Sequence, residues 1–361
     1  MKYRLFLVML TIAASCSRNA STIVAFQEVK TIEHIQNVLE LTDFHVVPVN
    51  TAGLIDLAVC DTLLLVSSSS DKDKYVTAYG IKEYNKVGSV FNKGRANGEL
   101  SGPKSFSSMG VDRSGDHFYV YVFDGQQNLI KVDLDNSLRS GNTVFETIES
   151  DTRLIAPRIT FLDDSSLMIT SLDERNCRKI RCIRDDDGTT RTTNNQNFLN
   201  DYSVSDPKDI NAISTLSSYG SKYKRVVEAG LQLNSIHIYS LSDNFAKTIH
   251  LGKPLSVESL LSMRESHIKD QFGHLVAYDD FFALLYYNAS ESDQINGRAK
   301  PRLLLFQWDG TPLAELPISF PASSFDIDLR TGEIYLLDRQ SDAILKCKLP
   351  SDLSWLISGA R

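Results

Sequence analysis

The sequence predicts an all-β fold, a six-bladed β-propeller of four-stranded antiparallel meanders that follows a short N-terminal helical or linker segment. Three observations predict it. From about residue 44 the chain consists of short apolar runs, rich in β-branched and aromatic residues, separated by Asp, Gly, Asn and Ser. These runs do not alternate with helical patterns, which disfavours a parallel α/β sheet. They also recur at intervals of roughly 50 residues, a period typical of propellers.

The repeat is clearest between two units that lie far apart in the chain. Met109–Asp112 and Phe325–Asp328 are each followed by a Gly turn, an apolar strand that ends in Asp, and a further apolar strand. Meanders of this kind are expected to begin near residues 54, 107, 156, 209, 274 and 322. One meander cannot bury both of its faces alone, so neighbouring blades must cover them in a closed ring. We expect Phe44–Val49 to close the ring by pairing with the blade that ends at Leu349.

The N-terminus has the pattern of a bacterial export signal. Lys2 and Arg4 precede the apolar run Leu5–Ala14, and these ten residues are too few to span a hydrocarbon core of roughly 30 Å. The small residues before Cys16 resemble the lipobox of bacterial lipoproteins, although Ala13 stands where Leu is usual. This resemblance implies cleavage after residue 15 and lipidation of Cys16. The alternative is an ordinary signal peptide that is cleaved nearby and leaves Cys16 as an incidental thiol.

These patterns divide the chain into four parts. Residues 1–15 are the predicted lipoprotein signal peptide, residues 16–43 the lipidated Cys and a tether, residues 44–350 the propeller, and residues 351–361 a C-terminal tail. Within the tether, apolar residues follow a helix-like spacing and predict a short helix. These residues are Val29, Ile32, Ile35, Val38 and Leu39.

Charge and location restrict the partners. The formal net charge is −7, with 45 acidic against 38 basic residues, so nucleic acid is not expected as a partner. The expected contact with the membrane is the lipid at Cys16. Ser17–Ser21 contains no acidic residue, and acidic residues at this place mark surface export in some Bacteroidetes lipoproteins. We therefore expect a lipid-anchored protein of the bacterial cell envelope that faces the periplasm.

Three segments of the body resemble one family. Lys93–Glu99 is similar to a glycine-containing turn of the TolB-like six-bladed propeller lipoproteins of Bacteroidetes, although Ala96-Asn97 replaces the usual Gly-Pro. Leu304–Gly310 resembles the outer strand and turn of that family, and Phe325–Leu349 resembles its closing blade. The resemblance implies the propeller. It does not imply the partners of the periplasmic TolB protein, because residues 17–43 are too few to form that protein's separate α/β domain.

A search for catalytic and metal-binding motifs predicts no catalytic residue, no metal site and no cofactor. The sequence lacks a G-x-S-x-G turn, a phosphate-binding loop and an H-E-x-x-H helix. The alternative function is that of a propeller hydrolase resembling the lactonases, with a carboxylate or Ca²⁺ site in the central channel. That alternative requires acidic residues such as Asp112, Asp328 and Glu258 to converge on the axis. Cys177 and Cys182 are either a disulfide or two small apolar residues.

Aromatic residues and long loops are the candidates for binding. Tyr286, Tyr287 and Trp308 form the candidate binding surface, although most aromatic residues of a propeller pack between its blades. The polar segments Asn288–Lys300 and Arg184–Asn200 are long loops on a rigid scaffold, where binding function is common. The sequence therefore predicts a binding scaffold for a protein, a peptide or a glycan, and it does not decide whether the protein is also an enzyme.

Overall fold

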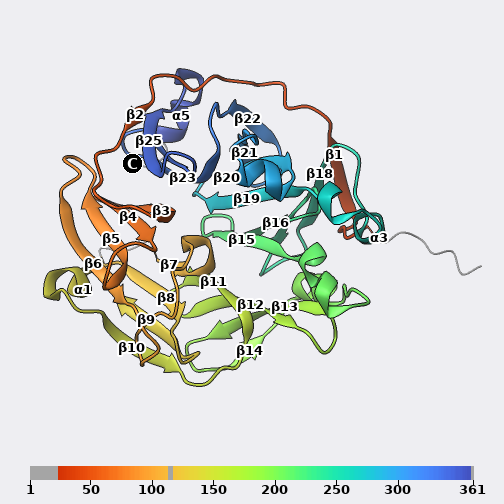
Figure 1. The fold of residues 1–361 in the computed structure, drawn as a ribbon. Helices are drawn as coiled ribbons and strands as arrows, with labels where there is room; N and C mark the ends of the chain where they lie inside the picture. Colours follow the sequence, from red (N-terminus) through yellow and green to blue (C-terminus); the bar gives the residue numbers. More distant parts are fainter. Residues whose placement is uncertain (1–22, 113–116, 359–361) are drawn as a thin grey trace, which may run out of the picture.

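Six antiparallel sheets form a ring around a central axis (Figure 1). The computed structural model describes residues 23–112 and 117–358. The first strands of neighbouring blades contact one another and line the axis, and between blades 1 and 2 both first strands contact the 3-10 helix Phe106–Ser108. Blade 1 consists of β3 (Leu54–Cys60), β4 (Leu63–Ser68), β5 (Lys74–Gly80) and β6 (Lys86–Asn92). Blade 2 consists of β7 (Gly110–Val111), β8 (Tyr119–Phe123), β9 (Leu129–Asp133) and β10 (Val144–Glu149). Blade 3 consists of β11 (Ile155–Asp163), β12 (Ser166–Asp173), β13 (Arg178–Asp185) and β14 (Thr190–Arg191).

The second half of the ring repeats this pattern. Blade 4 consists of β15 (Thr215–Gly220), β16 (Arg225–Gly230), β17 (Ser235–Ser240) and β18 (Ala246–Leu251). Blade 5 consists of β19 (Asp270–Ala277), β20 (Phe281–Ala289), β21 (Arg302–Gln307) and β22 (Pro312–Pro317). Blade 6 consists of β23 (Ala322–Asp328), β24 (Glu333–Asp338), β25 (Ala343–Lys348) and, from the N-terminal part of the chain, β2 (His45–Val46). The predicted six-bladed propeller is confirmed, and each blade's first strand begins within six residues of its expected start.

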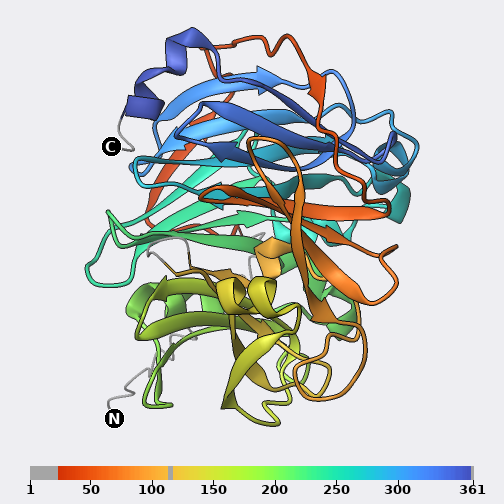
Figure 2. The ribbon, with the colours of Figure 1, turned by 90° about the vertical axis from the view of Figure 1, so that its left-hand side faces the viewer.

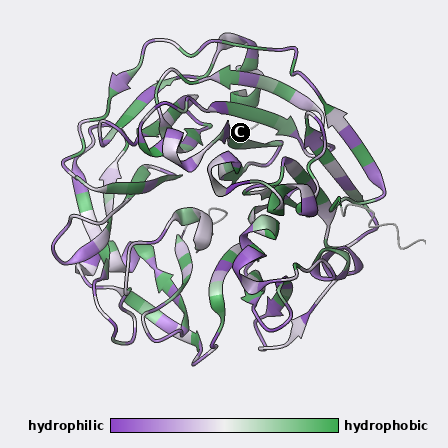
Figure 3. Ribbon diagram, turned by 45° about the vertical axis from the view of Figure 1, so that its right-hand side comes forward, coloured by the Kyte–Doolittle hydropathy of each residue, from purple (hydrophilic) through white to green (hydrophobic). Residues whose placement is uncertain are grey.

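The central strands of the blades are apolar on both faces. All six residues of β17 are buried, as are five of the six in β16 and β24, whereas most residues of the outer strand β10 are exposed or half-buried. Neighbouring blades cover both faces of each sheet, so these strands read as continuous apolar runs rather than alternating ones. Figure 3 shows the hydrophobic stretches in the strands and the hydrophilic ones mainly in the connections.

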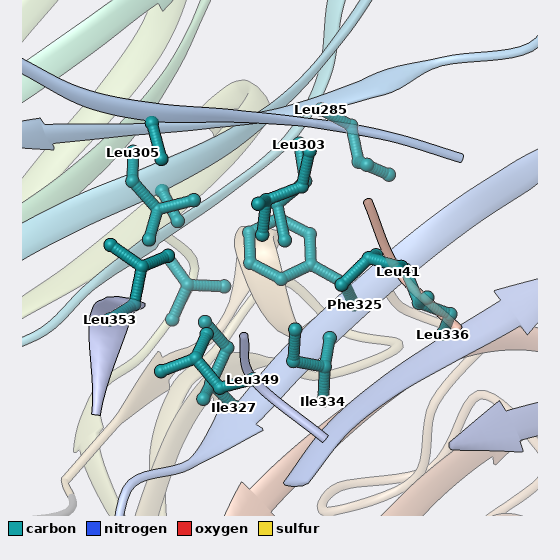
Figure 4. Close-up of a cluster of buried hydrophobic side chains, with 14 of the residues drawn as sticks. Leu41, Leu285, Leu303, Leu305, Phe325, Ile327, Ile334, Leu336, Leu349 and Leu353 are labelled. Carbon is teal, nitrogen blue, oxygen red and sulfur yellow. The ribbon is translucent and has the colours of Figure 1, made fainter. Parts of the chain in front are cut away.

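Packing between blades supplies the core. In the cluster between blades 5 and 6, Leu285 and Leu303 face Phe325 and Leu336, and Leu41 from the N-terminal segment covers them (Figure 4). The predicted C-terminal tail joins the same cluster through Leu353 and Leu356. Figure 2 shows helix α5 (Trp355–Ser358) beside the strands of blades 5 and 6.

The ring closes as the sequence predicts. Strand β2, within the expected donor Phe44–Val49, pairs with β25 in antiparallel register, and the Val47 amide donates to the Ile344 carbonyl at 2.8 Å. The Asp342 carboxylate of blade 6 accepts hydrogen bonds from the amides of Gly53 (2.7 Å) and Leu54 (2.8 Å) of blade 1. One blade thus contains strands from both ends of the ring.

The helix expected around Val29–Leu39 is wrong. Residues Glu28–Ile32 form strand β1, which pairs in parallel with β18 and adds a fifth strand to blade 4. The reason is the outer edge of β18, whose backbone groups are satisfied by a strand and not by a helix. The apolar residues of this segment do not share one buried face. Ile32 and Ile35 are buried, whereas Val29 and Val38 are 49% and 52% exposed.

The whole described part of the expected tether lies on the propeller. We call residues 23–47 the N-terminal belt. It runs around the rim from β1, past β22 through a bridge between Val38 and Glu315, to β2 (Figure 1). At its start Val24 and Phe26 are buried against blades 3 and 4. The belt covers the outer edges of blades 4, 5 and 6. Cys16 and the predicted signal peptide lie outside the described residues.

The helices are short and lie in connections. Those formed by the described residues are α1 (Leu134–Ser140), α2 (Asn194–Asn200), α3 (Val257–Leu261), α4 (Glu291–Ile295), α5, and the 3-10 helices η1 (Phe106–Ser108), η2 (Pro207–Ile213), η3 (Glu265–His267) and η4 (Ser351–Leu353). Within residues 23–112 and 117–358, no helix has the length and apolar character that crossing a membrane requires.

Candidate functional site

A cavity of about 760 Å³ lies between blades 4 and 5, where the belt passes from one blade to the next. Its walls are belt residues 32–38, parts of residues 251–271, which lead from blade 4 into blade 5, and the blade 5 residues Tyr286, Arg302 and Glu315. We call this cavity the inter-blade groove. In Figure 1 its region lies at the right, near β1, β18 and α3. A volume of this size is typical of ligand-binding pockets, which span roughly 300–1,000 Å³.

Asn234 at the start of β17 holds the connection that forms one wall. Its side-chain nitrogen donates to the carbonyls of Leu251 (2.7 Å) and Lys253 (2.8 Å), and its side-chain oxygen accepts from the Leu255 amide (3.1 Å). Gly252 lies between them with φ of +74°, which a side chain would disfavour, and its amide donates to Ile32 of the belt at 2.8 Å. The wall and the belt are therefore fixed to each other before any ligand binds.

Gln271 lies at an irregularity of the blade 5 sheet. The pairing of β19 with β20 shifts between Asp270 and Phe272, where one residue of β19 stands opposite two of β20, so Gln271 has no partner in the ladder. Its amide donates instead to the Leu231 carbonyl of blade 4 at 2.7 Å. The Gln271 side chain lines the groove, is 6% exposed, and makes no hydrogen bond to any residue that the structure describes.

Some charged residues of the groove form ion pairs within the groove, and others do not. Arg302 donates to both oxygens of Glu315, at 3.0 and 3.2 Å, so these two charges compensate each other. Lys253 and Lys269 are exposed and form no ion pair among the described residues, and Glu33 of the belt is the remaining acid of the lining. Lys269 lies close enough to Asp293 of α4 to help lower the pKa of that carboxyl. Lys253, Lys269 and Glu33 together leave the lining with a small excess of positive charge in a chain with a net charge of −7.

Of the three predicted aromatic residues, only Tyr286 lines the groove. It is 6% exposed, the Arg302 guanidinium lies 4.8 Å from its ring centre, and burial raises the pKa of its hydroxyl. Tyr287 donates from its hydroxyl to the Ala322 carbonyl of blade 6 at 2.7 Å. Trp308 is 2% exposed and donates from its ring nitrogen to the Tyr278 carbonyl at 3.0 Å. These three side chains do not form one exposed face, and whether Tyr286 takes part in binding stays a prediction.

The two long loops contribute little to the groove. Asn288–Lys300 contains α4, and only Asn288 reaches the groove lining. Arg184–Asn200 contains β14 and α2 and lies on blade 3. The groove consists mainly of shorter connections and the belt, which sequence patterns did not single out.

The acidic residues proposed for a channel site do not converge. Asp112 and Asp328 are buried at the ends of the first strands of blades 2 and 6, whereas Glu258 is exposed on α3. Within residues 23–112 and 117–358, no three His, Cys, Asp or Glu side chains are grouped so that they could hold a metal ion.

The buried carboxylates of the channel wall connect blades. The channel contains a second cavity of about 340 Å³, and His274 in its wall lies 3.7 Å from Asp56. Asp56 accepts hydrogen bonds from the amides of Leu57 and Phe106, at 2.8 and 2.7 Å, and from two serine hydroxyls, Ser105 and Ser324. Four donors saturate a carboxylate. This group therefore joins blades 1, 2 and 6 and has no oxygen left for a metal.

A buried charge network that the sequence analysis missed links blades 3 and 4. Arg181 of β13 donates to both oxygens of Glu228 of β16, which also accept from the hydroxyls of Thr215 and Tyr239. Lys179 lies 3.7 Å from the same carboxylate, and its ammonium donates to Thr215. Burial lowers the Lys179 pKa to about 7, and burial lowers the pKa of the nearby His237 to about 3.

The sequence of β13 contains an indication of this network. In Lys179–Cys182 basic and apolar residues alternate, and Lys179 and Arg181 are buried, like Glu228. The network fixes adjacent blades to each other, because removing Arg181 or Glu228 breaks the buried pair between blades 3 and 4, and loss of Glu228 leaves both cations without a counter-charge. The cysteines Cys177 and Cys182 nearby are both free thiols, which selects the non-disulfide alternative.

Comparison with known proteins supports the fold alone. No family model matches the sequence, and no curated protein matches it. Among solved structures, a member of the duf4221 family from Bacteroides vulgatus is similar with a TM-score of 0.55 and 8% identity, over 85% of this chain and 96% of that one. A nidogen/laminin complex gives a TM-score of 0.42 and 10% identity, over 74% of this chain and 85% of that one.

These observations define the class of protein. The chain is a six-bladed β-propeller, with a duf4221 protein as a distant structural neighbour and a groove of ligand-binding size between two blades. Such a fold is suited to a binding scaffold, because rigid blades position the loops and connections between them.

Proposed function

We propose that this protein is a lipid-anchored binding scaffold of the bacterial cell envelope, held at the membrane through Cys16 and facing the periplasm. Its ligand is a protein, peptide or glycan segment that enters the inter-blade groove. The observation that carries the proposal is the groove itself, a cavity of about 760 Å³ lined by the carboxamide of Gln271, which no described residue hydrogen-bonds, and by two exposed lysines. The chain's resemblance to propeller lipoproteins supports the lipid anchor.

The channel gives less support to the alternative, a propeller hydrolase. Asp56 is saturated by protein donors, and Asp326 accepts from the amides of Val59 and Ile327 and from the Tyr278 hydroxyl. Both carboxylates serve as links between blades. A hydrolase would need a carboxylate with an oxygen open to substrate or metal.

The anchor is tested by the variant Cys16→Ala in the full-length chain. We expect the mature variant to leave the membrane pellet for the soluble fraction after cell breakage, whereas the wild-type protein stays with the membranes. Two acyl chains or more give durable anchoring, so the difference should be nearly complete. Mature Cys16→Ala protein that still sediments with membranes contradicts the anchor.

The groove is tested by filling it. Val38 lines the groove and is 52% exposed, and Val29 lies on the same belt, is 49% exposed and does not line it. Wild-type protein, Val38→Trp and the matched control Val29→Trp are compared on peptide and glycan arrays. We expect Val38→Trp alone to lose binding. Array binding that Val38→Trp retains, or wild-type protein that binds neither array, refutes the groove as the binding site.

A further inference from the structure

We propose that the inter-blade groove binds an extended peptide in which an acidic side chain lies close to an aliphatic one. This inference rests on the proposed function and names the ligand class for the same site. Three features of the groove carry it: the unpaired carboxamide of Gln271, the two unpaired lysines, and an aliphatic rather than aromatic wall.

The Gln271 side chain matches a peptide bond. A carboxamide has N–H donors on one side and a carbonyl acceptor on the other, and a backbone peptide unit offers the complementary pair. The Gln271 carboxamide makes no hydrogen bond to the described residues, and its nitrogen and oxygen are open to the groove rather than sealed in the interior. An incoming amide supplies both missing hydrogen bonds.

The charge balance selects an acidic ligand. Arg302 is neutralised by Glu315, which leaves Lys253 as a cation available to a carboxylate, together with Lys269, whose charge also acts on Asp293. Glu33 across the groove repels an anion and disfavours a ligand with several adjacent acidic residues. A single Asp or Glu side chain between the two lysines satisfies both conditions.

The apolar part of the lining selects a peptide over a sugar. Val38 and Met263 are exposed aliphatic side chains on opposite walls, 52% and 38% exposed. They offer burial to a Leu, Ile or Met side chain of the ligand. A sugar ring would instead pack against an open aromatic face, and the one aromatic residue of the lining, Tyr286, is 6% exposed with Arg302 close to its ring.

The experiment measures fluorescence anisotropy of two pools of short labelled peptides, acetylated and amidated at their ends. One pool carries Asp or Glu near Leu, Ile or Met, and the other carries Lys or Arg in place of the acid. We expect the wild-type protein to bind the acidic pool at least about tenfold more tightly, a preference that weakens with added salt. Equal affinity for the two pools overturns the inference.

Three variants locate the binding. Lys253→Glu/Lys269→Glu should weaken binding of the acidic pool at least about tenfold, and Gln271→Met, which keeps the side-chain length, should weaken it about fivefold. The control Lys72→Glu/Lys82→Glu makes the same charge change at exposed lysines of blade 1 and should leave binding unchanged. Unfolding midpoints that match the wild type show that each variant is folded.

The outcomes separate the two proposals. Acidic peptides that bind Lys253→Glu/Lys269→Glu as well as the wild type overturn the inference. If neither pool binds, but a glycan binds the wild-type protein and not Val38→Trp, the groove remains the binding site and the peptide class is wrong. Loss of peptide binding in both groove variants, with the blade 1 control unchanged, supports the inference.

Discussion

Arg181 and Glu228 form a two-point ion pair inside the ring, although 47 residues separate them in the chain. The two nitrogen–oxygen distances are 2.7 and 2.9 Å, and the side chains are 4% and 0% exposed. Arg181 belongs to blade 3 and Glu228 to blade 4, so the pair fixes how these blades meet. The charged pair adds to an apolar cluster at this junction, in which Met168 and Ile183 of blade 3 pack with Val226 of blade 4.

Removing the Glu228 carboxylate should destabilise the junction between blades 3 and 4. Glu228→Gln leaves Arg181 and Lys179 without a compensating charge in the interior, and we expect it to lower the free energy of unfolding by about 3–5 kcal/mol. Urea denaturation measures the change. Asp206→Asn, which removes an exposed ion pair with Lys208, is the control and should leave the midpoint near the wild-type value. Equal small effects in both variants would contradict the structural role of Glu228.

Lys179 should make stability depend on pH. Burial lowers its pKa to about 7 in the folded chain from 10.5 in the unfolded chain, so between these values the unfolded chain binds more protons. The free energy of unfolding therefore rises with pH across this window, by at most about 1.4 kcal/mol per pH unit. Lys179→Met lacks this contribution, and its stability relative to the wild type should be greatest near neutral pH and decline toward pH 10. Denaturation curves across this range test it, and parallel pH profiles for the two proteins would refute it.

Gly220 leaves space for Trp308 where blades 4 and 5 meet. A Cβ atom at Gly220 would lie 2.2 Å from Cζ2 of Trp308, whose ring is anchored by the Tyr278 carbonyl. We expect Gly220→Ala to lower the free energy of unfolding by about 1–3 kcal/mol through overpacking. Gly102→Ala is the matched control, because nothing lies within 4 Å of a Cβ at that position. A Gly220→Ala variant as stable as the control would show that Trp308 can move aside at little cost.

The belt should open without unfolding the ring. Phe26 is 6% exposed, stacks on Phe198 at 5.0 Å, and donates from its amide to Thr248 of β18 at 2.9 Å. Phe26→Ala removes packing that contributes about 3 kcal/mol or more in a core. We expect faster hydrogen exchange in β18 with unchanged exchange in β24, because β18 lies beneath β1 and β24 does not. Uniformly faster exchange in all blades would contradict a separable belt.

The ring could be predicted from the sequence because its determinants are local. Each blade is a run of strands and turns whose apolar pattern repeats, and the closing strand Phe44–Val49 is itself an apolar run. Strand β1 could not be predicted in the same way. Its conformation depends on the open edge of β18, more than 200 residues away, and the spacing of Val29, Ile32 and Ile35 alone is typical of a helix.

The groove was missed for a related reason. Gln271 is an ordinary polar residue in the sequence, and its place in the groove depends on how blade 5 packs against blade 4 and the belt. Aromatic residues such as Trp308 drew attention because exposed aromatic side chains often bind ligands, but large rings are also the usual filling between blades. Composition does not distinguish these two roles, since burial depends on which strands become neighbours.

The belt also determines how the protein responds to mechanical load. A pull on the N-terminus, such as a membrane attachment would exert, reaches the five-residue ladder between β1 and β18 before it reaches β2. The β1–β18 ladder therefore breaks first under tension, and the pairing between β2 and β25 that closes the ring stays intact. Tension strong enough to peel off β1 would deform the wall of the groove at Ile32 while the six blades remain joined.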